Sequence, residues 1–440
     1  MHRIEISNFG PIKECKMDVN QFTVLTGPQA SGKSTIAKTI FFFKSLNDDL
    51  VKYFISAFEK NDFSSTVGSY SKILRKKFMD YFGTSRHLSS IFLKYYYSDN
   101  IWIDISLEKG TGYITTSFSN KFIEAVKHLT QKVESIYRSI EPKDASLLTS
   151  KDLLQMDSRK REFITQITKE CNLLFGDDRE LMFIPAGRSL LATLADQLQF
   201  IQPRRLDFLM RTFVERINML KPMFSQSLNE IIKARKLLTQ SEIDMNRTKL
   251  AEEIIGKILK GKYQVDKDGE KIYIHNSDKF VRLNFASSGQ QEALWILLLL
   301  FIIVLEQQNV FVVIEEPEAH LFPEAQKEIS ALIALVSNMQ QSQVIITTHS
   351  PYILASVNNL ILAHKIGKRY PEKVSAKINK NLWINRDKIF AAMVQSGVVS
   401  EIIDPEFDII QQEQIDSVSR IINEEFDYLY QYETADNTSM

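Results

Sequence analysis

The hydrophobic pattern near both ends of the chain is that of strands alternating with helices. At the N-terminal end, alternating positions predict a strand over Arg3–Ser7, a turn over Asn8–Pro11 and a second strand over Phe22–Thr26, followed by a helix over Ser34–Phe43. Towards the other end we expect a helix from about Gln290 to Leu305, a strand over Val310–Ile314, a helix after Pro323 and a strand over Gln343–Thr347. This alternation predicts an α/β fold built on a sheet.

The middle of the chain has a different pattern. Residues 120–260 are mostly helical in periodicity and are interrupted by Pro142, Pro185, Pro203 and Pro222. A predicted hairpin lies on each side of this stretch, over Ile101–Phe118 and over Tyr263–His275. We therefore expect a sheet domain whose two parts are separated by a helical insertion.

Composition and charge narrow the class of protein. Apolar residues make up 44% of the 440 positions, which is ordinary for a globular chain. The 54 basic and 54 acidic residues give no net charge, so the chain is not a polycation that coats nucleic acid. Cys15 and Cys171 are the only cysteines, which excludes a disulfide framework and suits a reducing cytosol. The longest apolar run, Ala293–Leu305, is too short for a membrane span, so a soluble cytoplasmic protein without a membrane partner is expected.

A phosphate-binding loop is the strongest chemical signal. Residues 27–34 read Gly-Pro-Gln-Ala-Ser-Gly-Lys-Ser, directly after a predicted strand and before a predicted helix. The glycines allow backbone amides to approach phosphate oxygens, Lys33 is expected to act on the β- and γ-phosphates, and Ser34 is expected to hold Mg²⁺. The predicted nucleotide contacts are Gly27, Pro28, Gln29, Ala30, Ser31, Gly32, Lys33, Ser34 and Thr35. The alternative is a Gly-Ser turn that matches the pattern by accident.

Two carboxylates follow the predicted strand Val310–Ile314. The strand is a continuous apolar run, as expected for a strand buried on both faces, and Glu315 and Glu316 come directly after it. Ligands of open α/β sheets bind at the carboxyl ends of strands, where the phosphate loop also lies. We assign Glu315 to the metal and Glu316 to the attacking water as general base. The alternative is a solvated acidic turn that caps a helix.

A second predicted helix start carries small polar residues. Ser287, Ser288, Gly289 and Gln290 precede the apolar helix, and hydroxyls and unpaired N–H groups at a helix start attract anions. One nucleotide rarely needs two such helix starts, so we expect this one to contact the nucleotide of a second copy. The alternative is a plain helix cap.

His349 ends the strand predicted over Gln343–Thr347. At that position an imidazole can hydrogen-bond the γ-phosphate or the attacking water, although a strand-end histidine is also commonly structural. His320, close after the carboxylates, is a weaker candidate for an interface residue.

In this order and spacing, the four elements resemble the head of the ABC-type ATPases. Ile6–Gly10, Glu315–Leu321 and Thr348–Pro351 are similar, more narrowly, to the OLD-like branch (AAA_15/AAA_21-type ATPases), relatives of the SMC and Rad50 heads. The resemblance covers the first 45 residues and about 280–360, and Phe183–Ser189 is the most family-like part of the middle. It implies ATP and Mg²⁺, and two heads clamped by ATP with the 287–290 signature of one facing the nucleotide of the other. The signature reads Ser-Ser-Gly-Gln here, where the branch often has Ser-Gly-Gly-Gln.

The resemblance also suggests how the chain is divided. We expect the N-terminal part of an ATPase head over 1–119, a helical insertion or arm over 120–262, the C-terminal part of the head over 263–365, and an extension with an acidic amphipathic helix over 366–440. Residues 401–440 hold eleven acids and one base, a net charge of −10, so residues 1–400 carry +10. From Gln411 the apolar spacing is near-helical, which predicts a helix that packs on the head or on a partner, or a solvated acidic face.

The implied function is that of an ATPase subunit without its own effector. Many OLD-like proteins carry a Toprim nuclease with an Asp-x-Asp pair, but the 91 residues after His349 contain no such pair. The resemblance therefore points to a subunit of a bacterial anti-phage complex, like the ATPases of Septu and PARIS, which oligomerises and controls a separately encoded nuclease or toxin. Its trigger is expected to be DNA or a phage protein.

The main alternative is a DNA-repair clamp of the RecF or Rad50 kind. Its candidate phosphate contacts are Arg204-Arg205, Arg159–Arg161 and Lys257–Lys262, which can equally be solvated helix faces. A transporter nucleotide-binding subunit and a scaffold that binds ATP without hydrolysing it are further alternatives.

Overall fold

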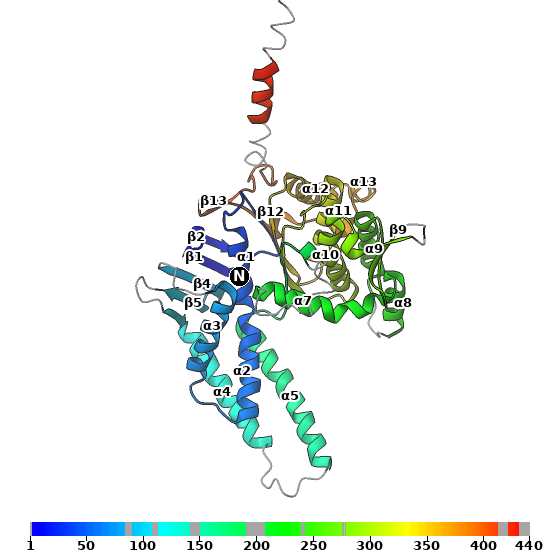
Figure 1. Cartoon of the computed structure of the whole chain (residues 1–440). Helices are drawn as coiled ribbons and strands as arrows, with labels where there is room; N and C mark the ends of the chain where they lie inside the picture. The colour runs from blue at the N-terminus through cyan, green and yellow to red at the C-terminus, as the bar shows by residue number, and fades with distance from the viewer. Residues whose placement is uncertain are drawn as a thin grey trace, which may run out of the picture.

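The computed structural model describes residues 2–83, 90–107, 113–140, 150–190, 207–238, 243–274, 277, 279–411 and 421–430. Its main feature is an 11-stranded sheet in the order β6-β5-β4-β1-β2-β14-β13-β3-β12-β11-β7 (Figure 1). The strands are β1 (Arg3–Phe9), β2 (Ile12–Asp18), β3 (Phe22–Thr26), β4 (Ile91–Ser98), β5 (Ile101–Leu107), β6 (Ile114–Phe118), β7 (Glu180–Ile184), β11 (Val310–Glu315), β12 (Gln343–Thr348), β13 (Ile389–Gln395) and β14 (Val398–Glu401). A separate three-stranded sheet contains β8 (Gly261–Asp266), β9 (Gly269–Ile274) and β10 (Phe280–Arg282). The predicted α/β class is confirmed.

Helices cover the sheet and extend beyond it. They are α1 (Lys33–Lys44), α2 (Leu46–Lys60), α3 (Thr66–Phe82), α4 (Asn120–Ile140), α5 (Ser150–Phe175), α7 (Phe208–Leu220), α8 (Leu228–Leu238), α9 (Met245–Leu259), α10 (Ser288–Leu305), α11 (Pro323–Ser337), α12 (Pro351–Gly367) and α13 (Pro371–Ser375). Helices α2, α4 and α5 pack on one another and project from the sheet as an arm (Figure 1).

One half of the sheet is antiparallel and the other half is parallel. Strands β6, β5, β4, β1 and β2 form an antiparallel series, whereas β13, β3, β12, β11 and β7 all run in the same direction. In the parallel half, all carboxyl ends therefore lie at one edge of the sheet. Parallel strands need helical crossovers, and these crossovers cover both faces.

Alternate residues of the central strands belong to two different cores. In β11, Val310, Val312 and Ile314 pack in a core with α7 and α9–α12, whereas Phe311 and Val313 pack in a core with α1–α5. β12 alternates in the same way, with Ile346 in the first core and Ile345 in the second. Both faces of the strands are buried, which explains their continuous apolar sequences.

Helix α10 is apolar on every side and lies inside the first core. Residues 291–305 of this helix are all buried, in contact with α9 and α11. Among the described residues it is the one helix long and apolar enough to span a membrane, and 83% of its apolar window is buried in the protein. The prediction of a buried core helix is confirmed.

The sheet takes strands from all four segments into which the sequence was divided. β7 lies within 120–262, which was expected to be mostly helical, and it pairs with β11 at the end of the sheet. β13 and β14 lie within 366–440, and β13 pairs with β3 beside the phosphate loop. β2 was not predicted either. The helical insertion and the C-terminal extension are therefore not separate from the head, because each contributes to its sheet.

Residues 421–430 form a helix whose side chains are all exposed (Figure 1). Its apolar side chains include Ile422, Phe426 and Leu429, which are 57–67% exposed. The predicted helix is present in this described part, and its apolar residues do not pack on the described part of the head.

We predict that Gly27→Ala destabilises the protein through a backbone clash. Gly27 has a φ of +141°, and an added Cβ would lie 2.2 Å from the carbonyl oxygen of Val394 in the neighbouring β13. The carbonyl belongs to a central strand and cannot move aside. The free energy of unfolding should therefore fall by more than the about 1–3 kcal/mol that backbone strain alone costs, and the melting temperature should fall with it.

Gly269→Ala is the matched control for this prediction. Its φ is +110°, but an added Cβ meets no heavy atom of the described chain within 4 Å, so it carries the strain without the clash. Scanning calorimetry should show the larger loss for Gly27→Ala, and equal losses would contradict the packing of the phosphate loop against β13.

Candidate functional site

The predicted site residues converge at the carboxyl edge of the parallel strands. The phosphate loop follows β3, His349 follows β12, and Glu315 ends β11. The strand registers align these ends, because Thr26 is paired with Thr348 and Glu315 with Thr347. Three motifs that are far apart in the sequence are thus brought to neighbouring positions, as expected for a ligand site in an open α/β sheet.

The phosphate loop has three residues with positive φ, and two of them are glycines. Gly27 and Gly32 have φ values of +141° and +109°, and Ala30 has +58°. Gly32 is the N-cap of α1, so the first amides of this helix border the loop. Lys33 is 5% exposed and its Nζ donates to the carbonyl oxygens of Gly27 (2.9 Å) and Pro28 (2.8 Å). The loop therefore holds a cation and a helix N-terminus close together, which suits an anionic phosphate.

The electrostatic surroundings of Lys33 agree with this role. Burial lowers the pKa of Lys33, while the carboxylates of Glu316 and Glu318 act in the opposite direction. The two carboxylates thus stabilise the positive charge of Lys33, which a bound phosphate would also stabilise.

Glu315 has a buried oxygen without a hydrogen-bond partner among the described residues. Its side chain is 5% exposed, and Oε2 accepts a hydrogen bond from the amide of Ala186 (3.2 Å). Oε1 is buried and makes no hydrogen bond within the described chain. A buried carboxylate oxygen without a partner is costly unless it binds a cation or accepts a hydrogen bond from an ordered water, so Glu315 fits the predicted metal role. The described residues contain no group of three or more His, Cys, Asp or Glu side chains placed for a metal. Mg²⁺ commonly uses few protein ligands and takes the others from phosphates and water.

Glu316 and His349 face each other across the site. Glu316 Oε1 lies 3.6 Å from His349 Nε2, and both side chains are partly exposed. Glu316 has a left-handed φ of +45°, and its amide donates to the carbonyl oxygen of Thr347 (2.9 Å). The chain therefore leaves β11 at Glu316 and turns this carboxylate towards the histidine.

Glu318 fixes the end of β12. Its Oε1 accepts hydrogen bonds from the hydroxyl of Thr348 and the amide of His349, both at 2.7 Å. Burial raises the pKa of Glu318, and these two hydrogen bonds oppose that rise. Glu318 was not predicted as a site residue, yet it links the turn after β11 to the histidine strand.

The signature residues 287–290 line a cavity that contains no residue of the phosphate loop. Ser287 caps α10, its hydroxyl accepts from the amide of Gln290 (3.3 Å), and Gln290 Nε2 donates to the carbonyl oxygen of Leu259 (2.8 Å). A cavity of about 750 Å³ is lined by residues of 257–260, 287–290 and 320–328, and His320 is among them. Gly289 packs against the His320 backbone, since an added Cβ would lie 2.7 Å from its carbonyl oxygen. The helix-cap interpretation therefore holds for Ser287 within one chain. Ser287 and Ser288 are also exposed, and no residue of the phosphate loop lines this cavity.

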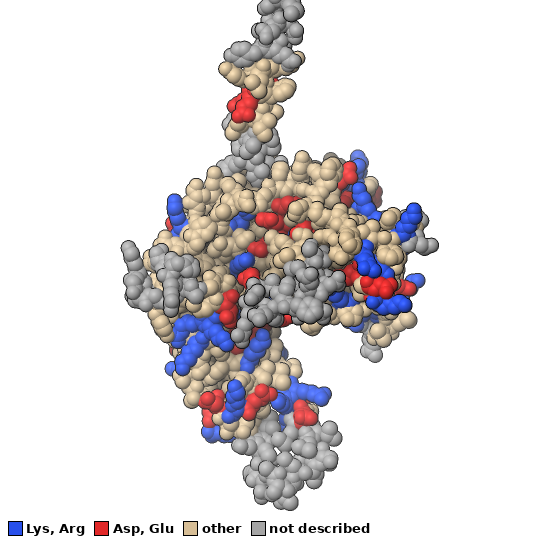
Figure 2. All heavy atoms as spheres, in the orientation of Figure 1, with Lys and Arg blue, Asp and Glu red and all other residues tan. Residues whose placement is uncertain are grey.

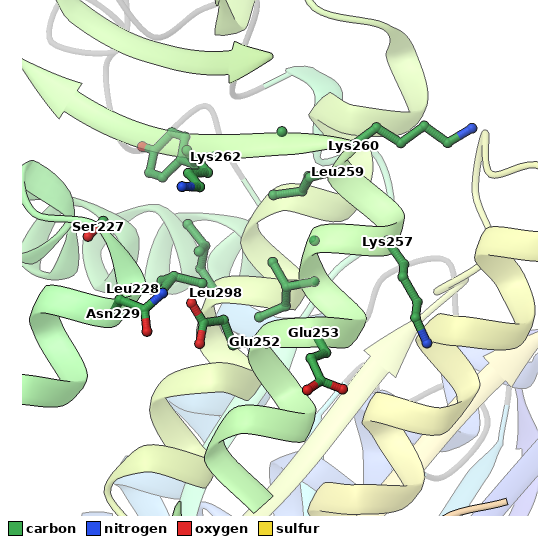
Figure 3. Close-up of a pocket in the computed structure, with 14 residues that line it drawn as sticks. Ser227, Leu228, Asn229, Glu252, Glu253, Lys257, Leu259, Lys260, Lys262 and Leu298 are labelled. Carbon is green, nitrogen blue, oxygen red and sulfur yellow. The ribbon is translucent and has the colours of Figure 1, made fainter. Parts of the chain in front are cut away.

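Three lysines of the 257–262 cluster, suggested as DNA contacts, are among the residues that line a second cavity. This cavity, of about 860 Å³, lies between the start of α8, α9 and β8, and Lys257, Lys260 and Lys262 border it (Figure 3). Glu252 and Glu253 line the same cavity, so its charge is mixed rather than purely basic. Arg204 and Arg205 lie outside the described residues. In the cluster Arg159–Arg161, Lys160 forms an ion pair with Glu59 (2.9 Å).

Two further site residues were missed by sequence reasoning. Arg188 is fully buried and hydrogen-bonds the end of β11, and Glu292 of α10 pairs with it. The sequence signal was present, since Arg188 lies in the family-like stretch Phe183–Ser189, but nothing in the local pattern indicated its partners.

Comparisons with known structures give long but loose alignments. The head of an SMC protein bound to the C-terminal winged-helix domain of ScpA is 13% identical, with 91% of this chain and 96% of that chain covered and a TM-score of 0.43. An SMC head domain from Thermotoga maritima is 12% identical, with coverages of 91% and 97% and a TM-score of 0.36. The Smc head with an extended coiled coil, bound to the C-terminal domain of ScpA from Pyrococcus furiosus, is 14% identical, with coverages of 96% and 100% and a TM-score of 0.36.

The family of the chain is shown by its sequence. No curated protein matches it significantly. A family model described as AAA ATPase domain matches residues 1–354, a range that contains every strand of the main sheet except β13 and β14. The chain therefore belongs to the AAA ATPase domain family.

Proposed function

We propose that this chain binds ATP with Mg²⁺ and hydrolyses it to ADP and phosphate. The observation that carries the proposal is the convergence of the phosphate loop, Glu315, Glu316 and His349 at one edge of the sheet. This convergence disfavours two alternatives, an accidental Gly-Ser turn and a solvated acidic turn, because neither explains why these residues lie at the same edge.

Each residue of the edge has a separate task in the proposed reaction. The amides of the phosphate loop and Lys33 bind the phosphates. To do so, Lys33 gives up its hydrogen bonds to the carbonyl oxygens of Gly27 and Pro28 and donates to phosphate oxygens instead. Ser34 and Glu315 would hold Mg²⁺, which neutralises charge on the phosphate oxygens. Glu316 accepts a proton from the attacking water as the water oxygen bonds to the γ-phosphorus. The bond between the γ-phosphorus and the β–γ bridging oxygen breaks, which gives ADP and inorganic phosphate. His349, beside Glu316, is placed to hydrogen-bond the γ-phosphate or the water.

Glu316→Gln is expected to separate binding from hydrolysis. Loss of the general base should lower ATP turnover by about 100-fold or more, while ATP affinity stays within a few fold of the wild-type value. Phosphate release and fluorescent-nucleotide binding measure the two quantities.

Lys33→Ala should instead lose ATP binding, and chelation of the metal should abolish wild-type turnover.

Glu372→Gln is the matched control for this substitution. Glu372 is an exposed acid of α13, outside the site, and its variant should behave as the wild type does. Unchanged turnover in Glu316→Gln would overturn the assignment of the base.

We further propose that two copies assemble around ATP, with Ser287, Ser288, Gly289 and Gln290 of one facing the nucleotide of the other. The signature supports this, because its exposed serines border a cavity that contains no residue of the phosphate loop. Phe322, 74% exposed, lines this cavity, and Phe285, 77% exposed, lies two residues before Ser287, so both offer apolar area to a partner. This pair of aromatic side chains is of the kind found at protein interfaces.

The biological setting that we propose is control of a separately encoded effector in bacterial anti-phage defence. The charge of −10 over 401–440 supports a chain that docks a basic surface of another protein. The exposed apolar side chains of the helix at 421–430 add a surface for such a partner.

A DNA-repair clamp is the second candidate, and the arm favours it. Helices α2, α4 and α5 extend from the head, and Figure 2 shows Lys and Arg side chains along them, interspersed with acidic ones. Arg159 and Arg161 are exposed on α5. An arm of this kind can lie along a phosphate backbone.

Co-expression with the neighbouring reading frame is expected to distinguish these functions. An effector-controlling ATPase should purify as a stable complex with the neighbouring product and bind DNA weakly. A clamp should ignore that product and bind duplex DNA with an affinity that falls steeply with salt and with Arg159→Glu/Arg161→Glu. A protein that binds neither would contradict both functions.

A further inference from the structure

Arg188 is a buried cation at the centre of the site. It lies in the loop after β7, and 0% of its surface is exposed. Burial lowers the pKa of Arg188, and Glu292 is the carboxylate that most strongly opposes this shift. A buried guanidinium is costly unless its donors are paired, so the identity of its acceptors shows what the residue organises.

One group of acceptors is the backbone that carries the catalytic carboxylates. Nη1 donates to the carbonyl oxygens of Pro185 (2.5 Å) and Glu315 (2.7 Å), and Nη2 donates to that of Glu316 (2.9 Å). The left-handed φ of Glu316 is unfavourable for a side chain of this size and persists only where its surroundings hold it. Arg188 grips the peptide groups on both sides of Glu316 and so holds this conformation.

The other acceptor is the start of the signature helix. Glu292 of α10 is 2% exposed, its Oε2 accepts from the amide of Arg188 (3.1 Å), and its Oε1 accepts from the amide of Ser189 (2.9 Å). Arg188 Nε donates to the backbone carbonyl oxygen of Glu292 (3.0 Å) and lies 3.3 Å from its Oε2. Glu292 follows Gly289 and Gln290 on the same helix, so any shift of the signature turn acts directly on this pair.

The same loop also reaches the metal carboxylate. The amide of Ala186 donates to Glu315 Oε2. The residues 185–189 therefore contact Glu315, the backbone of Glu316 and the first turns of α10 together, while none of these contacts involves the phosphate loop.

We infer that Arg188 is a positioning residue for hydrolysis, which holds Glu316 in place and links it through Glu292 to the signature turn of α10. When the signature turn moves on engaging a second copy, the Glu292–Arg188 pair passes that movement to the base. The inference rests on the proposed hydrolysis and adds to it a physical connection between dimer contact and the general base.

Glu292→Gln tests this link with little change in shape. Glutamine leaves one oxygen for the two amides of Arg188 and Ser189 and removes the negative charge beside the guanidinium, so the α10 side of the pair is weakened. The hydrogen bond from Arg188 Nε to the backbone of residue 292 and the contacts to β11 remain. We expect kcat to fall about 10-fold or more with ATP affinity unchanged within about threefold. Arg188→Met should lower kcat further, and Arg188→Lys, which keeps the charge, should recover part of the loss.

Lys44→Gln is the matched control for disturbing a buried ion pair. Lys44 is 1% exposed at its side chain and pairs with Asp177 at the far end of α1, away from the site. Its variant should lower the melting temperature without lowering kcat per folded molecule, which is the result expected of a purely structural pair.

The outcomes separate this inference from the function on which it rests. Wild-type turnover with an undiminished kcat in Glu292→Gln overturns the link and leaves the ATPase proposal intact. A Glu292→Gln protein that loses only thermal stability, as Lys44→Gln does, also overturns it. A wild-type protein without any turnover overturns both.

Discussion

Parallel pairing of β3, β12, β11 and β7 is the constraint on which the site depends. The pairing brings four carboxyl ends to the same edge, and each is followed by a loop with a chemical group: the phosphate loop, His349, Glu315–Glu316 and the 185–189 loop. A shift of one strand by one residue would turn every side chain to the opposite core and separate the paired ends. The two apolar cores that enclose these strands therefore also maintain the geometry of the site.

Buried charge is the second organising feature, and it lies where the cores meet the site. Arg188, Glu292 and Glu315 are each at most 5% exposed, and Arg188 and Glu292 compensate each other. Glu315 has one buried oxygen without a hydrogen bond to the described residues, which is consistent with the metal role proposed for it. The site is thus partly balanced by its own protein partners and partly by the ligand that it is proposed to bind.

The parts predicted from sequence are those whose signal is local. The phosphate loop, the carboxylates after an apolar strand and the strand-end histidine each carry their pattern within about ten residues, and their expected positions at strand ends are confirmed. β2 was missed although apolar residues alternate with charged ones in its second half, as in a half-buried strand. β7 was missed because five residues of strand lie within a largely helical region. The Arg188 network could not be predicted at all, since its partners lie 104 and 127 residues away and no local rule connects them.

We propose that one chain binds ATP at the parallel edge of the sheet and that the signature of a second chain completes the site. The most direct measurement is the native mass of the Glu316→Gln protein with and without ATP·Mg²⁺, together with the number of bound nucleotides. We expect the 50.8 kDa chain to form a dimer, or an assembly with an even number of chains, that holds one ATP per chain only when nucleotide is present. A protein that binds ATP fully yet keeps the mass of a single chain would contradict the role of the signature, and a protein that binds no ATP would contradict the site itself.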